Sequence, residues 1–275
     1  MAALKSQTLS RASFDAVAGY FLAQSGIRLG PEKHALVQGR VQRLAFEAGA
    51  RCLDEFVSTV MQGDDDVART RLVDRLTTNE TYFFREPEHF QFLGEVLSQV
   101  SVRDQAADPF RIWSAASSTG EEAFSIAMVL ADRLQMRRAW AVVGTDLSTE
   151  VVQKANRGLY PVSHADDVPE YYLRRFCLKG NGPHAGQMLM ARDLRERTRF
   201  LAANLLEPLP DIGMFDVIFL RNMLIYFDME TKADIVRRVL TRLKPGGYLL
   251  PGHSESLINL DLPIQPVRTA VYRHE

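Results

Sequence analysis

Residues 110–122 read Phe-Arg-Ile-Trp-Ser-Ala-Ala-Ser-Ser-Thr-Gly-Glu-Glu, and this stretch decides the fold that the sequence predicts. Its apolar run, 112–116, ends in small residues where a helix can begin, because Ser and Thr cap free N–H groups and glutamates suit the positive helix end. The helix that follows has one apolar face, formed by Phe124, Ala127, Met128 and Ala131. A second apolar run, 139–143, leads to Asp146. Strand, loop, helix and strand therefore predict a βαβ unit.

Asp146 indicates the class of ligand. A carboxylate at the end of the second strand can accept hydrogen bonds from both hydroxyls of a ribose. The loop lacks the Gly-x-Gly-x-x-Gly spacing, and Glu121 and Glu122 would repel a pyrophosphate at the start of the helix. The two acids favour a ligand with positive charge, such as S-adenosylmethionine, which has a ribose and a sulfonium but no phosphate. The residues leave open that both glutamates only complement the helix dipole.

Composition excludes several classes of protein. The chain has 275 residues, with 33 basic and 34 acidic side chains, so no overall charge attracts nucleic acid. It has no apolar run of about 18 residues, which predicts no membrane insertion, and its start lacks an apolar signal region, which predicts a cytoplasmic protein. Cys52 and Cys177 are too few and too far apart for a disulfide framework or a metal site, so we expect reduced thiols and no metal.

The pattern of apolar residues divides the chain into parts. Residues 1–76 read as a small helical domain, 77–100 as a linker and a helix that contributes to the active site, and 101–275 as an α/β domain. Within the helical part, Arg40 and Arg43 share a helix face at i, i+3. That pair is either an ordinary solvated face or a docking site for an acidic helical partner.

Two later regions complete the expected fold. Residues of about 172–200 read as an inserted antiparallel β-subdomain, because three short extended segments surround a glycine-rich loop; the segments are 172–178, 187–191 and 198–201. Toward the end of the chain we expect a helix that stops before Lys244-Pro245-Gly246-Gly247 and two further strands, 248–251 and 268–273.

Six motifs, in this order along the chain, resemble those of CheR-type chemotaxis-receptor methyltransferases. They are Leu-Thr-Thr-Asn-Glu-Thr-Tyr-Phe-Phe-Arg-Glu at 76–86, Trp-Ser-Ala-Ala-Ser-Ser-Thr-Gly-Glu-Glu at 113–122, Gly-Thr-Asp at 144–146, Phe-Asp-Val-Ile-Phe-Leu-Arg-Asn-Met-Leu-Ile-Tyr-Phe at 215–227, Leu-Lys-Pro-Gly-Gly at 243–247 and Gly-His-Ser-Glu at 252–255. The resemblance implies an α/β fold: a small N-terminal helical domain, then a Rossmann-like S-adenosylmethionine methyltransferase domain with a seven-stranded mixed sheet and the inserted β-subdomain.

The same resemblance implies an activity. Such enzymes transfer the methyl group of S-adenosylmethionine to glutamate side chains of methyl-accepting chemotaxis receptors, giving glutamyl methyl esters and S-adenosylhomocysteine in sensory adaptation. A glutamate side chain, with a free pKa of about 4.3, is already ionised at pH 7. Methyl transfer to it therefore needs orientation and a partly dry site, and no general base.

The candidate site joins the motifs to this chemistry. Arg85, Arg221 and Tyr226 are the expected catalytic residues, which would hold the substrate and cofactor carboxylates. The resemblance assigns Asn79 and Thr81 to the methionyl end of the cofactor, and Asn204 and Leu205 to the adenine. The full cofactor set expected is Asn79, Thr81, Arg85, Glu122, Asp146, Asn204, Leu205, Arg221 and Asn222.

The resemblance also implies partners, namely the cytoplasmic helical region of chemoreceptors and, in some members, a C-terminal receptor pentapeptide. Those members add the peptide as a strand to the edge of the β-subdomain, and their loop resembles the one here that carries Gly180, Gly182 and Gly186. For receptor docking by Arg40 and Arg43 the resemblance is weaker, because the family often has a denser basic row on that helix.

Two other functions compete with this interpretation. An amino-directed methyltransferase commonly has Pro-Pro-aromatic after the Asn or Asp of its fourth strand, whereas Met223 and Leu224 follow Asn222 here. The balanced charge also argues against nucleic acid. A non-catalytic S-adenosylmethionine-binding signalling module stays open as the alternative.

Overall fold

The structure is a computed structural model that describes residues 8–100, 108–135 and 138–275. The chain forms two compact units. The first comprises Met1–Thr78, Ser148–Glu150 and Tyr226–Thr231, and the second Asn79–Leu147, Val151–Ile225 and Lys232–Glu275. Among the described helices, none combines the length and the hydrophobicity that crossing a bilayer requires.

The first unit is helical, which confirms the predicted N-terminal helical region. Its helices are α1 (Arg11–Ser25), α2 (His34–Glu47), α3 (Leu53–Gln62) and α4 (Asp66–Leu76), with a short 3-10 helix η1 (Pro31–Lys33). Helix α1 begins at Ser10, whose side chain accepts the Ser13 N–H, and ends at Gly26 with a positive φ of 69°. The apolar faces of the helices form the core of this unit, for example at Phe14, Phe21 and Val41.

The second unit is built on a seven-stranded sheet in the order β6-β2-β1-β7-β8-β10-β9. The strands are β1 (Phe110–Ala115), β2 (Trp140–Asp146), β6 (Thr198–Ala202), β7 (Phe215–Leu220), β8 (Leu243–Pro251), β9 (Ile264–Arg268) and β10 (Val271–His274). Strands β6, β2, β1, β7 and β8 pair in parallel, whereas β10 runs antiparallel to β8 and to β9. This is the predicted mixed sheet.

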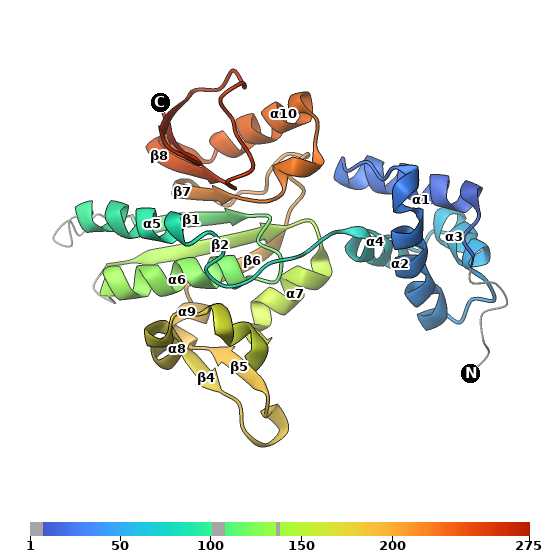
Figure 1. Cartoon of the computed structure of the whole chain (residues 1–275), viewed down its shortest axis with the longest axis horizontal. Helices are drawn as coiled ribbons and strands as arrows, with labels where there is room; N and C mark the ends of the chain where they lie inside the picture. The colour runs from blue at the N-terminus through green and yellow to red at the C-terminus, as the bar shows by residue number, and fades with distance from the viewer. Residues whose placement is uncertain (1–7, 101–107, 136–137) are drawn as a thin grey trace. The chain divides into compact units, whose positions relative to one another are not determined.

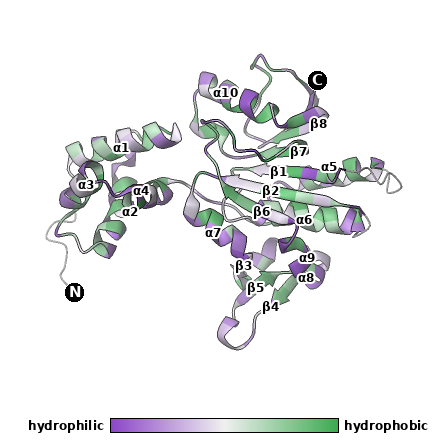
Figure 2. Ribbon diagram, turned by 180° about the vertical axis from the view of Figure 1, so that it is seen from behind, coloured by the Kyte–Doolittle hydropathy of each residue, from purple (hydrophilic) through white to green (hydrophobic). Residues whose placement is uncertain are grey.

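Helices pack on this sheet and bury its central strands. They are α5 (Pro87–Gln99), α6 (Glu121–Arg133), α7 (Thr149–Arg157) and α10 (Met229–Leu240). Helices α5 and α6 lie side by side along the sheet (Figure 1). Strands β1 and β2 are largely buried, and apolar residues make up most of the first and greater part of β2, which is green in Figure 2.

A second, three-stranded antiparallel sheet lies apart from the large one within the same unit (Figure 1). Its order is β3-β5-β4, from β3 (Leu159–Pro161), β5 (Gln187–Met190) and β4 (Cys177–Lys179). The short helices of this region are η3 (Val162–Asp167), α8 (Glu170–Phe176), η4 (Gly182–His184) and α9 (Arg192–Arg195).

The structure corrects the expected segments of this insertion. Residues 172–176 belong to helix α8, because Tyr172 stacks on Phe84 at 5.5 Å between ring centroids and Phe176 is buried, so their apolar side chains pack from a helix. Residues 198–201 lie in β6 of the large sheet, and the small sheet gains β3 instead.

Two further expectations fail near the end of the chain. The register of β7 and β8 passes from Phe215–Leu243 to Val217–Tyr248, so 244–247 bulge out of a strand that starts at Leu243. The proline and glycines are thus not a helix stop; α10 already ends at Leu240. The stretch 268–273 is not one strand, because the chain turns at Ala270 (φ 53°) between β9 and β10.

Candidate functional site

The carboxyl ends of β1, β2, β7 and β8 meet at one edge of the sheet, and the candidate site lies in the loops that follow them. Backbone strain is concentrated there. Of seven described non-glycine residues with positive φ, five belong to the site region: Phe84, Glu86, Ala116, Ser118 and Asn222. Such conformations persist only where surrounding contacts hold them, and they gather at binding sites.

The loop after β1 turns sharply into α6. Its last residue, Gly120, caps the helix with φ 95°, and α6 has no side-chain cap, so the expectation that Ser or Thr caps it is wrong. Glycine is needed because a Cβ would lie 2.9 Å from the Phe200 ring and 2.9 Å from the Ala155 Cβ. The loop therefore passes close to its neighbours and leaves its serines for other contacts.

Asp146 ends β2 and holds this loop. Its Oδ2 accepts the backbone N–H of Ser118 at 2.8 Å, and its side chain is nearly buried, with 8% of the residue exposed. The Ser118 hydroxyl in turn donates to the Asn79 carbonyl at 2.9 Å. The end of β2, the loop after β1 and the segment that begins at Asn79 are thus joined. Thr81 lies in the same segment, half-buried.

Arg221 follows β7 and pairs with two carboxylates. Its Nη1 lies 2.8 Å from Glu122 Oε2 and its Nη2 lies 3.1 Å from Glu86 Oε2, while its side chain is 1% exposed. It also donates to the Arg85 carbonyl at 2.5 Å. Glu122 accepts a further hydrogen bond from the Ser114 hydroxyl at 2.7 Å. The buried guanidinium is therefore compensated on both sides.

Glu86 is a site residue that the sequence analysis missed. It accepts hydrogen bonds from Arg221, from Asn222 Nδ2 at 3.3 Å and from the His253 backbone N–H at 3.3 Å. Burial raises the pKa of Glu86, but the Arg221 charge and these hydrogen bonds outweigh burial and leave the pKa below its ordinary value. The sequence feature that could have identified Glu86 is its position at the end of the 76–86 motif, directly before Pro87.

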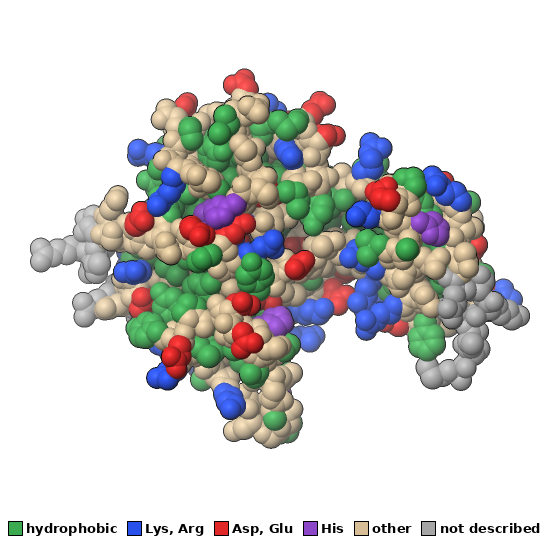
Figure 3. All heavy atoms as spheres, viewed as in Figure 1, with side chains coloured by type: hydrophobic (Ala, Val, Ile, Leu, Met, Phe, Trp, Pro, Cys, Tyr) green, Lys and Arg blue, Asp and Glu red, His purple; other side chains and the backbone are tan. Residues whose placement is uncertain are grey.

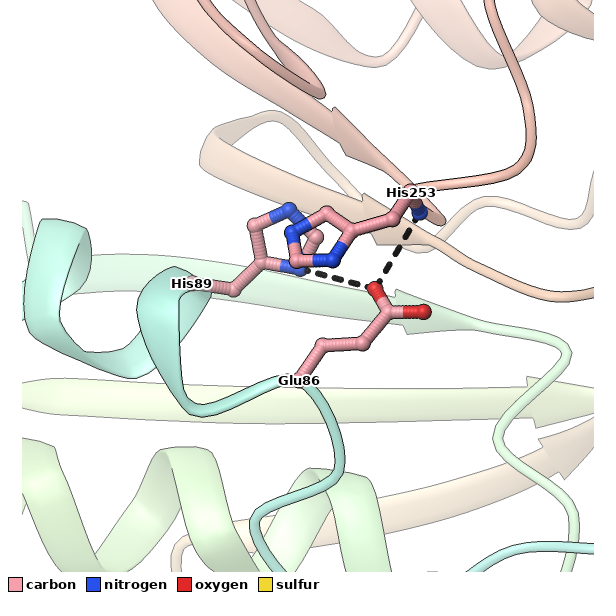
Figure 4. A group of neighbouring side chains, drawn as sticks. All are labelled: Glu86, His89 and His253. Atoms are coloured by element: carbon pink, nitrogen blue, oxygen red, sulfur yellow. Dashed lines mark hydrogen bonds and ion pairs between the residues drawn. The ribbon is translucent and has the colours of Figure 1, made fainter.

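Glu86, His89 and His253 form the group of potential metal ligands shown in Figure 4. Their donor atoms lie within 4.8 Å of one another, and His89 Nδ1 is 3.4 Å from Glu86 Oε2. Burial, together with the Arg221 charge, lowers the pKa of His89 to about 4, so its ring is neutral at pH 7. The single carboxylate of the group, Glu86, already pairs with Arg221 at 3.1 Å, so little negative charge is left to offset a divalent metal ion. We therefore interpret the group as a polar cluster around Glu86.

Charged side chains of both signs surround the group. On the face drawn in Figure 3, histidine, acidic and basic side chains lie next to one another in the α/β unit. Arg85 differs from Arg221 in that the described contacts of its side chain are to uncharged groups. Its Nη1 donates to the Glu80 carbonyl at 3.2 Å, and its guanidinium lies 5.5 Å from the Tyr82 ring centroid. Within residues 8–100, 108–135 and 138–275, no carboxylate forms an ion pair with Arg85.

The two adjacent glutamates of α6 have different surroundings. Glu121 is 1% exposed, lies 3.2 Å from His164 Nδ1 and accepts the Thr119 hydroxyl at 2.6 Å. Burial raises its pKa. Glu122 pairs with Arg221 instead. Of the two, only Glu122 belongs to the group of site residues that the structure brings together.

Asn204 and Leu205 follow β6, the neighbour of β2. Asp146 pairs in register with Ala202, so these two residues lie just beyond the same edge. The Asn204 side chain accepts the Leu206 N–H at 3.0 Å, and the Leu205 carbonyl accepts a hydrogen bond from Arg238 at 2.6 Å. The loop is thus fixed at the sheet edge beside Asp146.

Three expected residues belong to the first unit, whereas the residues grouped above belong to the second. Tyr226 ends the 3-10 helix η5 (Leu224–Tyr226) and is 39% exposed. Arg40, in the same unit, donates to the Leu76 carbonyl at 2.6 Å, and burial lowers its pKa. Arg43 is exposed and pairs with Glu47 at 3.3 Å.

The glycine-rich loop connects β4 and β5, and β4 is an edge strand of the small sheet. Gly180 donates its N–H to the Gln187 carbonyl at 2.8 Å, and a Cβ there would lie 2.0 Å from the His184 carbonyl oxygen. Gly182 and Gly186 have positive φ, 51° and 82°. The loop conformation therefore requires glycine at these positions.

Comparisons with known proteins agree with this geometry. The sequence model of the family described as CheR methyltransferase, SAM binding domain, matches residues 79–272, more than half of the chain. A chemotaxis protein methyltransferase of Salmonella typhimurium is 38% identical over 254 residues, covering 92% of this chain and 86% of that protein. One from Escherichia coli is 35% identical over 92% of this chain and 87% of its own. Chemotaxis protein methyltransferase 1 of Pseudomonas aeruginosa is 35% identical over 96% and 98%.

Proposed function

Because the chain belongs to the CheR family of S-adenosylmethionine-dependent methyltransferases, we propose that it methylates glutamate side chains of methyl-accepting chemotaxis receptors. The products are glutamyl methyl esters and S-adenosylhomocysteine, and the modification serves sensory adaptation. The observation that carries the proposal is the grouping of Asp146 and the Arg221–Glu122 pair at one sheet edge, with Arg85 unpaired by any carboxylate within the described residues.

The donor set fits the cofactor. S-adenosylmethionine supplies an electrophilic methyl group on a positively charged sulfur. Asp146 would accept hydrogen bonds from the ribose hydroxyls, and Glu122 would offset the positive charge of the ligand. The first turn of α6 carries two carboxylates, which disfavours a phosphate and suits a cationic ligand.

The remaining residues of the site have complementary roles. Asn79 and Thr81 contact the methionyl end, where the Ser118 bond to the Asn79 carbonyl holds the segment in place. Asn204 and the backbone of Leu205 contact the adenine beyond the β6 edge. Arg221 and Asn222 hold the carboxylates of Glu86 and Glu122, and through them the shape of the site.

The chemical step needs little from the protein beyond placement. A glutamate oxygen of the receptor donates an electron pair to the methyl carbon, the O–C bond forms, and the C–S bond breaks with its electron pair going to sulfur. No proton moves, because the glutamate is ionised at neutral pH. Arg85 orients that carboxylate and keeps it in line.

Receptor contacts outside the site form the finer part of the proposal. The exposed edge of β4 offers backbone groups to which a C-terminal receptor pentapeptide would add as a strand. Arg43, on an exposed helix face, would contact acidic receptor helices; Arg40 contributes less, because it is tied to the Leu76 carbonyl. The site of action is the cytoplasmic region of the receptors.

The test is transfer of labelled methyl from S-adenosylmethionine to cytoplasmic receptor fragments, each with and without its C-terminal tail. We expect base-labile label, the signature of a carboxyl methyl ester, on at least one fragment. Reduced label on removing the tail would support the β4 contact. Intact cofactor binding with no label on any fragment would overturn the proposal in favour of a non-catalytic signalling module.

A further inference from the structure

Glu255 has a buried carboxylate that is bonded to the backbone of the site. The residue is 5% exposed. Its Oε2 accepts the N–H of Asn222 at 2.7 Å and the N–H of Gly252 at 2.8 Å, and its Oε1 accepts the N–H of Ile225 at 3.2 Å. Within the described residues no Lys, Arg or His forms an ion pair with it. Backbone N–H groups stabilise its charge but only partly offset burial, which raises the pKa of Glu255.

The carboxylate bridges the ends of two neighbouring strands. Leu220 at the end of β7 pairs with Pro251 at the end of β8, and the chains then separate into the loops that Glu255 joins. Gly252 makes room for this contact: a Cβ there would lie 2.7 Å from Glu255 Oε2 and 3.1 Å from the Asn222 nitrogen. A side chain at 252 would push apart the Glu255 carboxylate and Asn222, whose Nδ2 would lie 2.9 Å from the added Cβ, and so break the bond between them.

Asn222 is the residue whose conformation needs this support. It adopts φ 58°, which costs a non-glycine residue free energy, and it stands directly after Arg221. Its N–H is held by Glu255 and its side chain amide by Glu86. If the N–H bond is lost, the chain can relax to a negative φ, and Arg221 then leaves its place between Glu86 and Glu122.

We propose that Glu255 is a positioning residue for the cofactor site: its carboxylate fixes the backbone at Asn222 and so holds Arg221 between Glu86 and Glu122. The inference rests on the proposed function, because it assigns Glu255 to the same site. We assign Glu255 no direct contact with the cofactor. It acts through the backbone of the loop after β7, and Glu122 is the group whose orientation toward a cationic ligand finally depends on it.

If Glu255 only stabilised the fold, its loss would lower stability without weakening cofactor binding. A second carboxylate of the same sheet, that of Asp216, provides the control. Asp216, near the amino end of β7, accepts the Arg111 N–H at 2.7 Å and pairs with Lys244 Nζ at 2.8 Å. It also joins neighbouring strands, but at the edge opposite the cofactor site. We expect loss of either carboxylate to lower the free energy of unfolding, and only loss of Glu255 to displace Arg221 from its place between Glu86 and Glu122.

The experiment compares Glu255→Gln and Asp216→Asn in the full chain. Urea unfolding gives the stability of each, and calorimetry gives the Kd for S-adenosylhomocysteine at a temperature where both are folded. We expect Glu255→Gln to bind about ten-fold more weakly or worse, since amide N–H groups now face backbone donors, and Asp216→Asn to keep the wild-type Kd. Methyl transfer at saturating cofactor should also fall in Glu255→Gln alone.

The outcomes separate the inference from the proposed function. Wild-type affinity in a folded Glu255→Gln variant overturns the positioning role, as does an equal loss of affinity in both variants. If Glu255→Gln does not fold, Gly252→Ala is the second variant, because it displaces the same carboxylate, and it must show the same loss of affinity. A wild-type protein that fails to bind S-adenosylhomocysteine would overturn the proposed function and not this inference alone.

Discussion

Arg221 Nη1 lies 2.8 Å from Glu122 Oε2, and this ion pair joins the end of β7 to the first turn of α6. Together with the Glu86 contact at 3.1 Å, it places one buried cation between two carboxylates that come from segments 36 residues apart. The pair explains why a cationic ligand can be received at an acid-rich edge without the acids repelling one another in the free protein.

Replacing Arg221 by Gln should therefore destabilise the protein. Two carboxylates lose their partner, and breaking a buried ion pair costs about 3–5 kcal/mol. Urea unfolding measures the loss, and the double variant with Glu86→Gln should recover part of it, because one uncompensated charge is removed. Arg242→Gln is the control: Arg242 pairs with the exposed Asp211 at 3.4 Å, and its loss should change stability by less than about 0.5 kcal/mol. Equal effects of the two substitutions would contradict the interpretation.

Asp146→Ala should weaken cofactor binding by about 1–3 kcal/mol, the cost of losing a charged hydrogen-bond acceptor. Calorimetry with S-adenosylhomocysteine measures it. Asp132→Ala is the matched control, because Asp132 pairs with Arg175 at 2.9 Å on the surface. Unchanged affinity in the Asp146 variant would remove this residue from the ribose site.

Arg85→Ala should lower kcat/KM for methyl transfer by about 10–100-fold, the loss of a hydrogen bond to a charged group, and leave the chain folded. The fold should be unaffected because the Arg85 side chain, which the substitution removes, contacts only the Glu80 carbonyl and the Tyr82 ring among its described partners. Receptor labelling and urea unfolding are measured together, with Arg237→Ala on the exposed surface of α10 as control. A folded variant with full turnover would contradict a role for Arg85 in the site.

His89 should make stability depend on pH. Its pKa is about 4 in the folded protein and 6.5 as a free side chain, so between these values the unfolded chain binds more protons. The part of the unfolding free energy that depends on His89 is therefore highest above pH 6.5, where His89 is neutral in both states, and falls as the pH falls toward 4. It amounts to about 3 kcal/mol. We expect His89→Gln to flatten the plot of unfolding free energy against pH in this window. His184→Gln, on the surface, should leave the slope of the wild type; the same slope in the His89 variant would refute the assignment.

Gly180→Ala tests the contact of the β-subdomain with a receptor tail. The added Cβ would lie 2.0 Å from the His184 carbonyl oxygen, so the loop beside β4 must shift. We expect reduced labelling of receptor fragments that carry the tail and unchanged labelling of fragments without it. Gly19→Ala in α1, where a Cβ meets nothing within 4 Å, is the control. Equal reduction on both kinds of fragment would argue against a tether.

The βαβ unit from Phe110 to Asp146 was predictable because local patterns specify it: apolar runs, a loop of small residues, and an acid at a strand end. The insertion was less predictable. Residues 172–176 have apolar side chains that suit a strand as well as a helix, and Tyr172 became helical through its packing on Phe84. The bulge at 244–247 likewise depends on how β8 pairs with β7.

The sequence by itself determined the class of fold, the family and the residue types of the site, because these depend on periodicity and on motifs that are contiguous in the chain. Only the tertiary structure decided which side chains meet. Glu86, Glu122 and Arg221 are joined by strands that end at one edge, and Glu255 reaches Asn222 because β8 lies beside β7. Such contacts depend on strand order and register, which no local pattern specifies.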